Sequence, residues 1–305
     1  MSILVIGGTG TLGRQIVKRA IDEGYQVRCL VRNLRRSAFL KDWGAEIVYG
    51  DITIPETIPA AFKGVQIVID ASTLRPTDDY NAEKVDWRGK KALLEVAKLS
   101  NIKRFIFFSF FGTKDKTTIP LLDLKLKFIK LLKESDVSCT VFQCAGFFQG
   151  LINQYAIPVL DKQTIWLFDK TIKTPFIDTQ DAAKIVISTL KEKQKKNEQY
   201  YLVGSKAWAP EEIINFCENL SGEKAKISYI PTVLLGGIKN LFRSLEFTWN
   251  IADRLEFSEI FSGIEITKNS SYKNLETKDL LSLEQYLKEY FVKIFKKLKE
   301  INYNQ

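Results

Sequence analysis

The sequence predicts a doubly wound parallel α/β sheet followed by a smaller C-terminal α+β or helical subdomain. Throughout residues 1–145, short apolar runs alternate with amphipathic stretches, which is the pattern of strands joined by crossover helices. The runs are rich in Val, Ile and Phe and lack polar alternation, as expected of strands that are buried on both faces. The chain has 305 residues, of which 45% are hydrophobic, so it can bury a core of this size.

The alternation of apolar runs and amphipathic stretches predicts each element of the first 145 residues in turn. The expected strands are the apolar runs, namely Ile3–Ile6, Gln26–Val31, Ala45–Val48, Val65–Ile69, Arg104–Ser109 and Ser138–Phe142. The expected helices are the amphipathic stretches between them, namely Leu12–Glu23, Arg36–Trp43, Ile58–Phe62, Asn81–Leu99 and Leu122–Glu134.

After Phe142 the pattern is less regular. It predicts helices over Phe147–Leu160, Thr179–Leu190 and Pro210–Leu220, short strands over Tyr200–Val203 and Ile227–Tyr229, and an aromatic-rich helical region over Leu234–Phe261. Additions of this kind usually sit over the carboxyl ends of a parallel sheet and shape a pocket there.

From Leu283 onward the sequence predicts a basic amphipathic helix. Its lysines lie largely off an apolar stripe that comprises Leu287, Phe291, Ile294, Phe295, Leu298 and Ile301. Such a helix either caps a domain or lies on an anionic membrane or a partner surface. The more frequent role is packing against a domain, and the second interpretation stays open.

Histidine is absent from the chain, which excludes several kinds of chemistry. Without imidazole there can be no Ser-His-Asp or Cys-His nucleophile and no HExxH zinc helix. Acid–base work must therefore fall to Lys, Tyr, Asp, Glu or Cys. Four scattered cysteines are too few for a disulfide framework or a metal site, so we expect free, buried thiols and no metal at Cys29, Cys139, Cys144 and Cys217.

The net charge and the chain's apolar runs say little about partners. The charge of +9 is spread along the chain, and no RNA-binding motif accompanies it, so a nucleic-acid partner is not expected. No stretch approaches 18 uninterrupted apolar residues, so no transmembrane helix is expected. Met1 and Ser2 lead directly into the first apolar run, so we expect a protein that is made where it works or has lost its leader.

A glycine-rich turn, Gly7-Gly8-Thr9-Gly10-Thr11-Leu12-Gly13, separates the first strand from the first helix. Gly7 allows a tight turn, Gly10 lets the backbone approach a pyrophosphate, and Gly13 lets the helix pack closely on the strand. The helix N-terminus then offers N–H groups to phosphates. We predict a Rossmann-type dinucleotide-binding domain over residues 1–145, with Gly7, Thr9, Gly10, Thr11, Leu12 and Gly13 at the cofactor. Residues 146–305 would form a partner or substrate region packed on the carboxyl edge of the sheet. A merely structural turn is the alternative.

The residues that follow the next strands indicate which dinucleotide binds. Arg32 ends the second strand, where an NAD-specific fold places an acid for the ribose 2′-hydroxyl, and two further arginines follow. A guanidinium there would pair with a 2′-phosphate, which favours NADP over NAD; a solvated basic loop is the alternative. Asp51, followed by Ile52 after the third strand, is placed to reach an adenine amino group. Ala71, after the fourth strand, would line the middle of the cofactor.

Motifs along the whole chain carry a family resemblance. The glycine turn, Val31-Arg32-Asn33, Gly50-Asp51 and the stretch from Asp86-Trp87-Arg88-Gly89 to Ile102-Lys103-Arg104-Phe105-Ile106 resemble the NmrA-like branch of the atypical short-chain dehydrogenases/reductases. Further motifs resemble the plastid-encoded and cyanobacterial members that help to assemble photosystem II, namely those over residues 120–125, 143–152, 154–158 and 178–183. The resemblance covers nearly the whole chain.

The resemblance also implies which residues would be catalytic. Short-chain dehydrogenases use Tyr-x-x-x-Lys on the helix after the fifth strand, where the Lys holds the nicotinamide ribose and lowers the Tyr pKa. Lys125 matches the Lys and Ser109 matches the active-site Ser, but Leu121 stands in the place of the Tyr and cannot transfer a proton. Asp123 is near in sequence but faces elsewhere on a helix. We place Ser109 and Lys125 at the cofactor; the alternative is that Lys125 is one more exposed lysine.

Two functions remain open. In the first, the chain is an NADP-binding, non-catalytic assembly factor for the photosystem II reaction centre. The resemblance then implies reaction-centre intermediates and small single-helix chlorophyll-binding proteins as partners, and a place in the chloroplast stroma, peripherally at the thylakoid membrane. In the second, it is an NADPH-dependent reductase of an unknown small molecule that uses Lys125. The missing tyrosine and the extent of the resemblance favour the first.

Overall fold

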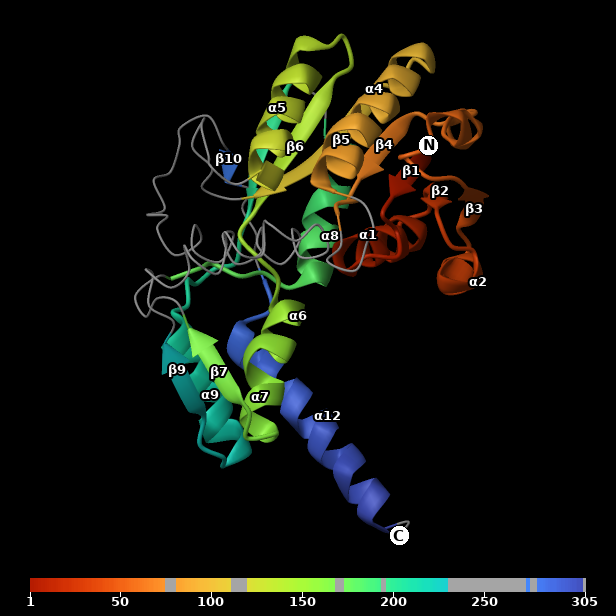
Figure 1. Cartoon of the computed structure of the whole chain (residues 1–305). Coiled ribbons are helices and arrows are strands. Elements are labelled where there is room, and N and C mark those ends of the chain that lie inside the picture. Colours follow the sequence, from red (N-terminus) through yellow and green to blue (C-terminus); the bar gives the residue numbers. More distant parts are fainter. Residues whose placement is uncertain are drawn as a thin grey trace.

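A computed structural model describes residues 1–74, 81–110, 120–167, 173–192, 196–229, 273–274 and 279–303. It shows a main body built on a parallel sheet, and a smaller lobe from which the C-terminal helix extends (Figure 1). The predicted region Leu234–Phe261 lies outside the described residues.

The sheet of the main body has the strand order β10-β8-β6-β5-β4-β1-β2-β3. Its strands are β1 (Ser2–Ile6), β2 (Gln26–Val31), β3 (Glu46–Tyr49), β4 (Ile67–Asp70), β5 (Arg104–Phe110), β6 (Cys139–Cys144), β8 (Glu198–Leu202) and β10 (Lys273–Asn274). Every neighbouring pair is parallel. The chain order reverses between β1 and β4, and open α/β sheets bind ligands outside the carboxyl ends of their strands at such a switch point. The predicted doubly wound parallel sheet is confirmed.

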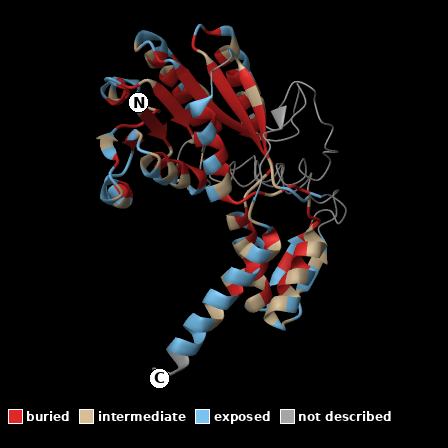
Figure 2. Cartoon of the chain, turned by 180° about the vertical axis from the view of Figure 1, so that it is seen from behind, coloured by how far each residue is buried: buried red, intermediate tan, exposed pale blue. Residues whose placement is uncertain are grey.

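Helices cover both faces of this sheet, and each face has its own apolar core. On one face lie α1 (Thr11–Asp22), α2 (Ala38–Asp42) and α8 (Thr179–Ser188); on the other lie α3 (Pro59–Phe62), α4 (Lys90–Leu99) and α5 (Pro120–Glu134). Strand β1 serves both cores, because Ile3 and Val5 join the first and Leu4 and Ile6 join the second. Burial on both faces, visible in Figure 2, explains why the strands lack polar alternation.

The lobe lies beyond the carboxyl ends of β6 and β8 (Figure 1). It contains α6 (Phe148–Leu151), η4 (Ile152–Ala156), α7 (Ile157–Leu160), β7 (Thr164–Leu167), α9 (Pro210–Ser221), β9 (Lys226–Tyr229) and α12 (Leu283–Tyr303). Strands β7 and β9 form a separate parallel pair. A third core, which includes Phe148, Tyr155 and Phe291, belongs to this lobe.

Two predicted helices differ from the structure for the same reason. The stretch Asn81–Leu99 contains the π-helix η3 (Glu83–Gly89) before α4, and Phe147–Leu160 contains the π-helix η4 between α6 and α7. A π-helical turn holds more residues than an α-helical one, so a 3.6-residue periodicity does not register it. Strand β7 was not predicted, whereas its partner β9, of the same length, was.

The division at residue 145 stays a prediction. Strands β8 and β10 and helix α8 come from beyond that residue, and they belong to the layers of the main body. The later part of the chain therefore builds the lobe and also completes the sheet.

Helix α12 confirms the predicted packing in its first half. Leu283, Leu287 and Phe291 are buried in the core of the lobe, whereas Leu298 is exposed. The side chain of Ile301 lies outside the described part of the structure. Among the described residues no helix combines the length and the apolar character that a membrane crossing requires.

Candidate functional site

The glycine turn joins β1 to α1 at the carboxyl edge of the sheet, and two of its glycines are required by the local geometry. Gly7 has a φ of +79°, and a Cβ there would lie 2.7 Å from the backbone nitrogen of Ser72. A Cβ on Gly13 would overlap the carbonyl oxygen of Gly7, so α1 packs directly on the turn. At Gly10 a Cβ would meet only that same carbonyl oxygen within 4 Å. The turn is thus tight at both ends and accessible in its middle.

Helix α1 begins with no side-chain cap. Gly10 is its N-cap residue, and no acidic residue occupies the first turn. Arg14, in that helix, donates hydrogen bonds to the carbonyl oxygens of Thr9 and Gly10. The N–H groups at Thr11 and Leu12 therefore carry the partial positive charge of a helix N-terminus without a nearby carboxylate, an arrangement suited to phosphate.

The other predicted cofactor residues lie at the same edge of the sheet. Arg32 follows β2 directly and is exposed, and Ala71 follows β4 and is half-buried. Asp51 and Ile52 are buried after β3, where Asp51 Oδ1 accepts hydrogen bonds from the N–H and the hydroxyl of Thr53, both at 2.8 Å. One carboxylate oxygen of Asp51 therefore stabilises the turn at residues 51–53. The contact of Asp51 with an adenine stays a prediction.

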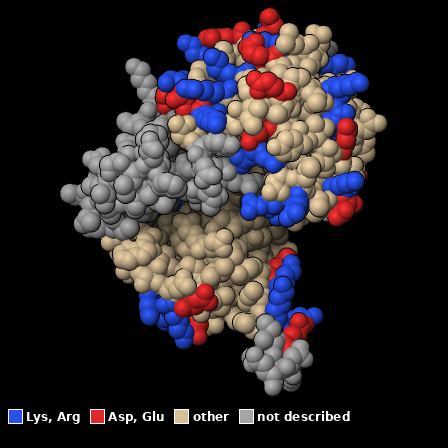
Figure 3. Space-filling model, turned by 45° about the vertical axis from the view of Figure 1, so that its right-hand side comes forward, with Lys and Arg blue, Asp and Glu red and all other residues tan. Residues whose placement is uncertain are grey.

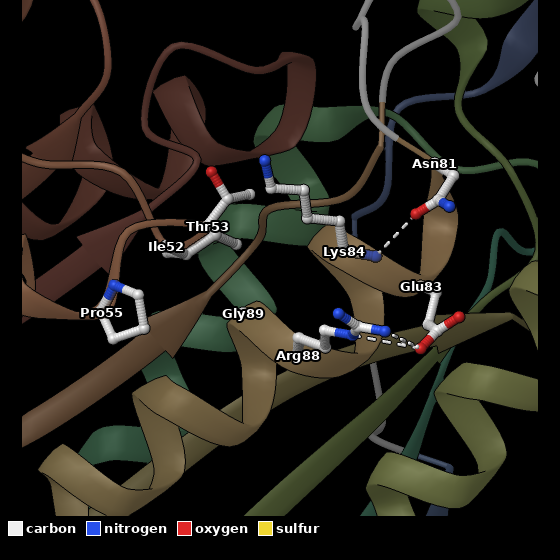
Figure 4. A pocket seen from close by; sticks show the side chains of 8 residues that line it. All are labelled: Ile52, Thr53, Pro55, Asn81, Glu83, Lys84, Arg88 and Gly89. Carbon is white, nitrogen blue, oxygen red and sulfur yellow. Dashed lines mark hydrogen bonds and ion pairs between the residues drawn. The ribbon is translucent and has the colours of Figure 1, made fainter.

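Beside this edge is a cavity of ≈ 320 Å³, between the loop after β3 and helix η3. Figure 4 shows the residues that line it, namely Ile52, Thr53, Pro55, Asn81, Glu83, Lys84, Arg88 and Gly89. Arg88 is paired with Glu83 at 2.8 Å, so its charge is matched within the wall. Of the predicted cofactor residues, only Ile52 lines this cavity, which therefore borders the predicted site at its adenine end.

Ser109 is the next-to-last residue of β5 and is 2% exposed. Its Oγ has no hydrogen-bond partner within the described residues. Buried hydroxyl groups nearly always have a partner, so an unpaired one at this edge is a position where a ligand atom could bond.

Two buried ion pairs lie beneath the site, and we call their members Asp70, Asp86, Lys90 and Lys125 the buried charge set. Lys90 Nζ lies 2.8 Å and 2.7 Å from the two carboxylate oxygens of Asp70, and both side chains are fully buried. The same ammonium donates to the carbonyl oxygen of Ser72 at 2.7 Å and to its hydroxyl at 2.6 Å. Burial lowers the pKa of Lys90, and the nearby carboxylates oppose this shift.

The second ion pair joins helix α5 to helix η3. Lys125 Nζ lies 3.3 Å from Asp86 Oδ1, with the side chains 3% and 0% exposed. Asp86 also accepts a hydrogen bond from the Thr73 hydroxyl and one from the Leu74 N–H, both at 3.0 Å. The two carboxylates therefore hold residues 72–74, the loop that contacts the glycine turn.

The structure separates Lys125 from Lys127 and Lys130, which lie on the same helix α5. The exposed fraction of its side chain is 3%, against 58% for Lys127 and 80% for Lys130. The alternative that Lys125 is one more exposed lysine is therefore wrong. Asp123 pairs with Lys127 at 2.7 Å, which confirms that it faces away from Lys125.

Asp70, Asp86 and Lys90 were missed by the sequence analysis, although a signal was present. Asp70 ends an apolar strand, and Asp86 and Lys90 stand four residues apart in a helical stretch. A charged residue inside an element that must be buried needs a partner of opposite charge, and this rule would have selected all three.

The cysteines are buried, as expected. Burial raises the pKa of Cys29 to about 12 and that of Cys139 to about 11, so neither is a thiolate near neutral pH. No group of side chains suited to a metal ion occurs in the described part of the chain.

The residues present fit a dinucleotide. Three features lie at the edge of the sheet that includes the switch point. They are the glycine turn, where a side chain on Gly7 or Gly13 would clash, the N-terminus of α1, which has no acidic residue in its first turn, and the unpaired buried hydroxyl of Ser109. Whether the predicted residues bind a cofactor stays a prediction.

Comparisons with known proteins agree with this geometry. The model of the NmrA-like family matches residues 1–290. The chain is 49% identical to the photosystem II assembly factor Ycf39 of Guillardia theta, over 99% of this chain and 98% of that protein. It is 40% identical to the chloroplastic protein High Chlorophyll Fluorescence Phenotype 244 of Arabidopsis thaliana, over 98% of this chain and 77% of that protein.

A solved structure shares the fold at lower identity. The triphenylmethane reductase of Citrobacter sp., in complex with NADP(H), aligns with a TM-score of 0.72 and 20% identity over 94% of this chain and 99% of that one.

Proposed function

The chain belongs to the NmrA-like family and is a homologue of photosystem II assembly factors, and from this premise we propose that it binds NADP and assists assembly of the photosystem II reaction centre without catalysing a reaction. The observation that carries the non-catalytic part is Leu121, which stands in the place of the family's tyrosine and has no proton to give.

NADP would lie along the carboxyl edge of the sheet. Its pyrophosphate would bind at Gly10 and the uncapped start of α1, and its 2′-phosphate at Arg32. The nicotinamide end would lie toward Ser109, with Lys125 behind it. When bound as NADPH, the cofactor supplies a hydride, but this chain offers no obvious group to exchange the accompanying proton.

The proposed partners and location follow from the homology. We infer that the clients are reaction-centre assembly intermediates and small single-helix chlorophyll-binding proteins. The place of action would be the stromal side of a plastid, peripherally at the thylakoid membrane. The chloroplastic relative supports this location.

A second candidate is an NADPH-dependent reductase that uses Lys125. The observation that favours it is that Lys125 is buried beside the site, while Lys127 and Lys130 on the same helix are exposed. A functional lysine would be buried beside the site in this way.

One experiment separates the two candidates. The tagged full chain is purified from thylakoid-containing cells, its co-purifying proteins are identified, and its oxidation of NADPH is measured with metabolite extracts. If the chain is a non-catalytic assembly factor, reaction-centre subunits should co-purify with it, and it should not oxidise NADPH. Consumption that is lost in a Lys125→Met variant that still folds and binds NADPH, but kept in Lys127→Met, the exposed lysine of the same helix, would establish the reductase instead.

A further inference from the structure

Helix α12 has two halves with different surroundings. As far as Phe291 its apolar stripe is buried in the core of the lobe. One turn further, Phe295 still packs against that core, and toward its C-terminus the helix extends away from the lobe with a largely exposed surface (Figures 1 and 2). Ile294 and Phe295 are half-buried, and Leu298 is 49% exposed, although all three continue the buried stripe. We call residues 292–300 the free half of α12.

The lysines of α12 are exposed and form no ion pair with an acid in the described part of the chain. Several lysines of the main body, by contrast, pair with a carboxylate about one turn away, as Lys18 does with Asp22 on α1 and Lys98 does with Glu95 on α4. Acidic and basic side chains are interspersed on the face of the main body seen in Figure 3. No such pair is formed within the described residues by the five lysines of α12, namely Lys288, Lys293, Lys296, Lys297 and Lys299. The free half holds four of these lysines and a single acid, Glu300.

The lysines lie on both sides of the stripe. At 100° per residue, Lys297 and Lys293 fall on one flank of the line through Ile294 and Leu298, while Lys299 falls on the other and Lys296 falls opposite. Long lysine stems can cover apolar surface while their ammonium groups reach outward. The free half is thus a short apolar stripe bordered by cations.

We propose that the free half of α12 docks on an anionic lipid surface, with Leu298 toward the acyl region and the flanking lysines Lys293, Lys297 and Lys299 among the headgroups. The proposal deepens the membrane location given in the proposed function and rests on it. Charge complementarity selects this occupant. Lysines on both flanks of an apolar stripe suit a plane of mobile negative charges, whereas a protein groove would need fixed carboxylates matched to each one. Because the apolar stripe is short, most of the affinity must come from charge.

The test uses the full chain and vesicles of phosphatidylcholine with and without phosphatidylglycerol, followed by co-sedimentation. We expect binding only to the anionic vesicles, and binding that falls as salt is added. The triple variant Lys293→Gln, Lys297→Gln, Lys299→Gln should bind about 100-fold more weakly, since each basic residue near an anionic surface changes affinity about fivefold. The matched control replaces three exposed lysines elsewhere, Lys98, Lys130 and Lys224, by Gln and should bind as the wild type does.

A second pair of variants tests the apolar stripe. Leu298→Ser should weaken vesicle binding, whereas Leu99→Ser, which changes a leucine 84% exposed at the end of α4, should not. Equal sedimentation with both kinds of vesicle, or a triple variant that binds as tightly as its control, would overturn the proposal. So would a triple variant that keeps vesicle binding but loses a protein partner, because the free half would then be a protein-docking element.

The outcome is independent of the rest of the proposed function. NADPH titration and recovery of reaction-centre subunits are measured on the same variants. Loss of vesicle binding alone, with both of these retained, is the expected result. Absence of NADPH binding or of reaction-centre subunits in the wild type would remove the proposed function without touching the vesicle result.

Discussion

Replacement of Lys90 by methionine tests the buried charge set directly. Methionine has a side chain of similar length and keeps most of the packing, but it removes the ammonium that Asp70 and Ser72 share. Asp70 is 1% exposed, so its carboxylate would stay buried without its cation. Breaking a buried ion pair from one side costs about 3–5 kcal/mol. We expect Lys90→Met to lower the free energy of unfolding by that amount. This is a large share of the total free energy of unfolding of a folded domain, which is roughly 5–15 kcal/mol.

The assay is urea unfolding followed by circular dichroism, with NADPH affinity measured in parallel. Lys98→Met is the matched control, because Lys98 lies on the same helix and its pair with Glu95 is exposed, so its loss should cost about 0.5 kcal/mol or less. The double variant Asp70→Asn, Lys90→Met should recover much of the loss, since no uncompensated charge then stays buried. This variant remains informative even where Lys90→Met alone does not fold.

Two results would refute this reasoning. A loss below about 1 kcal/mol for Lys90→Met, the size typical of exposed pairs, would mean that solvent reaches the ammonium. A double variant as unstable as the single one would mean that the packing of the lysine stem matters, and not its charge.

Three further predictions concern the cofactor edge and the surface of the main body. Arg32→Glu should weaken NADPH binding about tenfold or more while leaving NADH binding nearly unchanged in titration calorimetry; equal losses would remove the 2′-phosphate role. Gly13→Ala should displace the start of α1, abolish NADPH binding and cost about 1–3 kcal/mol of stability, whereas Gly150→Ala, which meets nothing within 4 Å, should change neither. Burial opposes the ionisation of Glu23, but hydrogen bonds from two basic side chains outweigh it and hold the pKa of Glu23 below its usual 4.5. Its stabilising contribution is therefore complete above pH 4.5 and is lost as the pH falls through the folded pKa, so the deficit of Glu23→Gln, about 1 kcal/mol near neutral pH, should shrink in acid unfolding curves.

The sheet was predictable because its strands are short apolar runs between turns. Strand β2 was predicted to the residue, and the other strands of the first half of the chain were placed to within a few residues. The lobe was harder to predict, because its helices are interrupted by a π-helical turn at Ile152–Ala156. Its strand Thr164–Leu167 was not predicted, although Thr, Ile and Trp favour strands.

From local sequence alone, the site was predictable only where the conformation of the neighbouring backbone requires a particular residue type. The glycines of the turn satisfy that condition, since their steric need arises from neighbouring backbone. Lys125 does not satisfy it, because its partner Asp86 lies on a different helix, so only the family resemblance, and no local reason, separates Lys125 from Lys127. Contacts between elements decide which charges are buried, and these contacts require the fold.

The strand order has a consequence for how the chain folds. Apart from the pair β1–β4, the pairs among strands β1 to β6 join strands that are consecutive in the sequence and linked by one crossover, whereas β8 reaches β6 only after the first part of the lobe and α8 have been made. In a chain synthesised from its N-terminus, the outer edge of β6 therefore stays unpaired during that interval. An unpaired edge formed by a buried, apolar strand is a template for intermolecular pairing, so aggregation during synthesis should begin at β6.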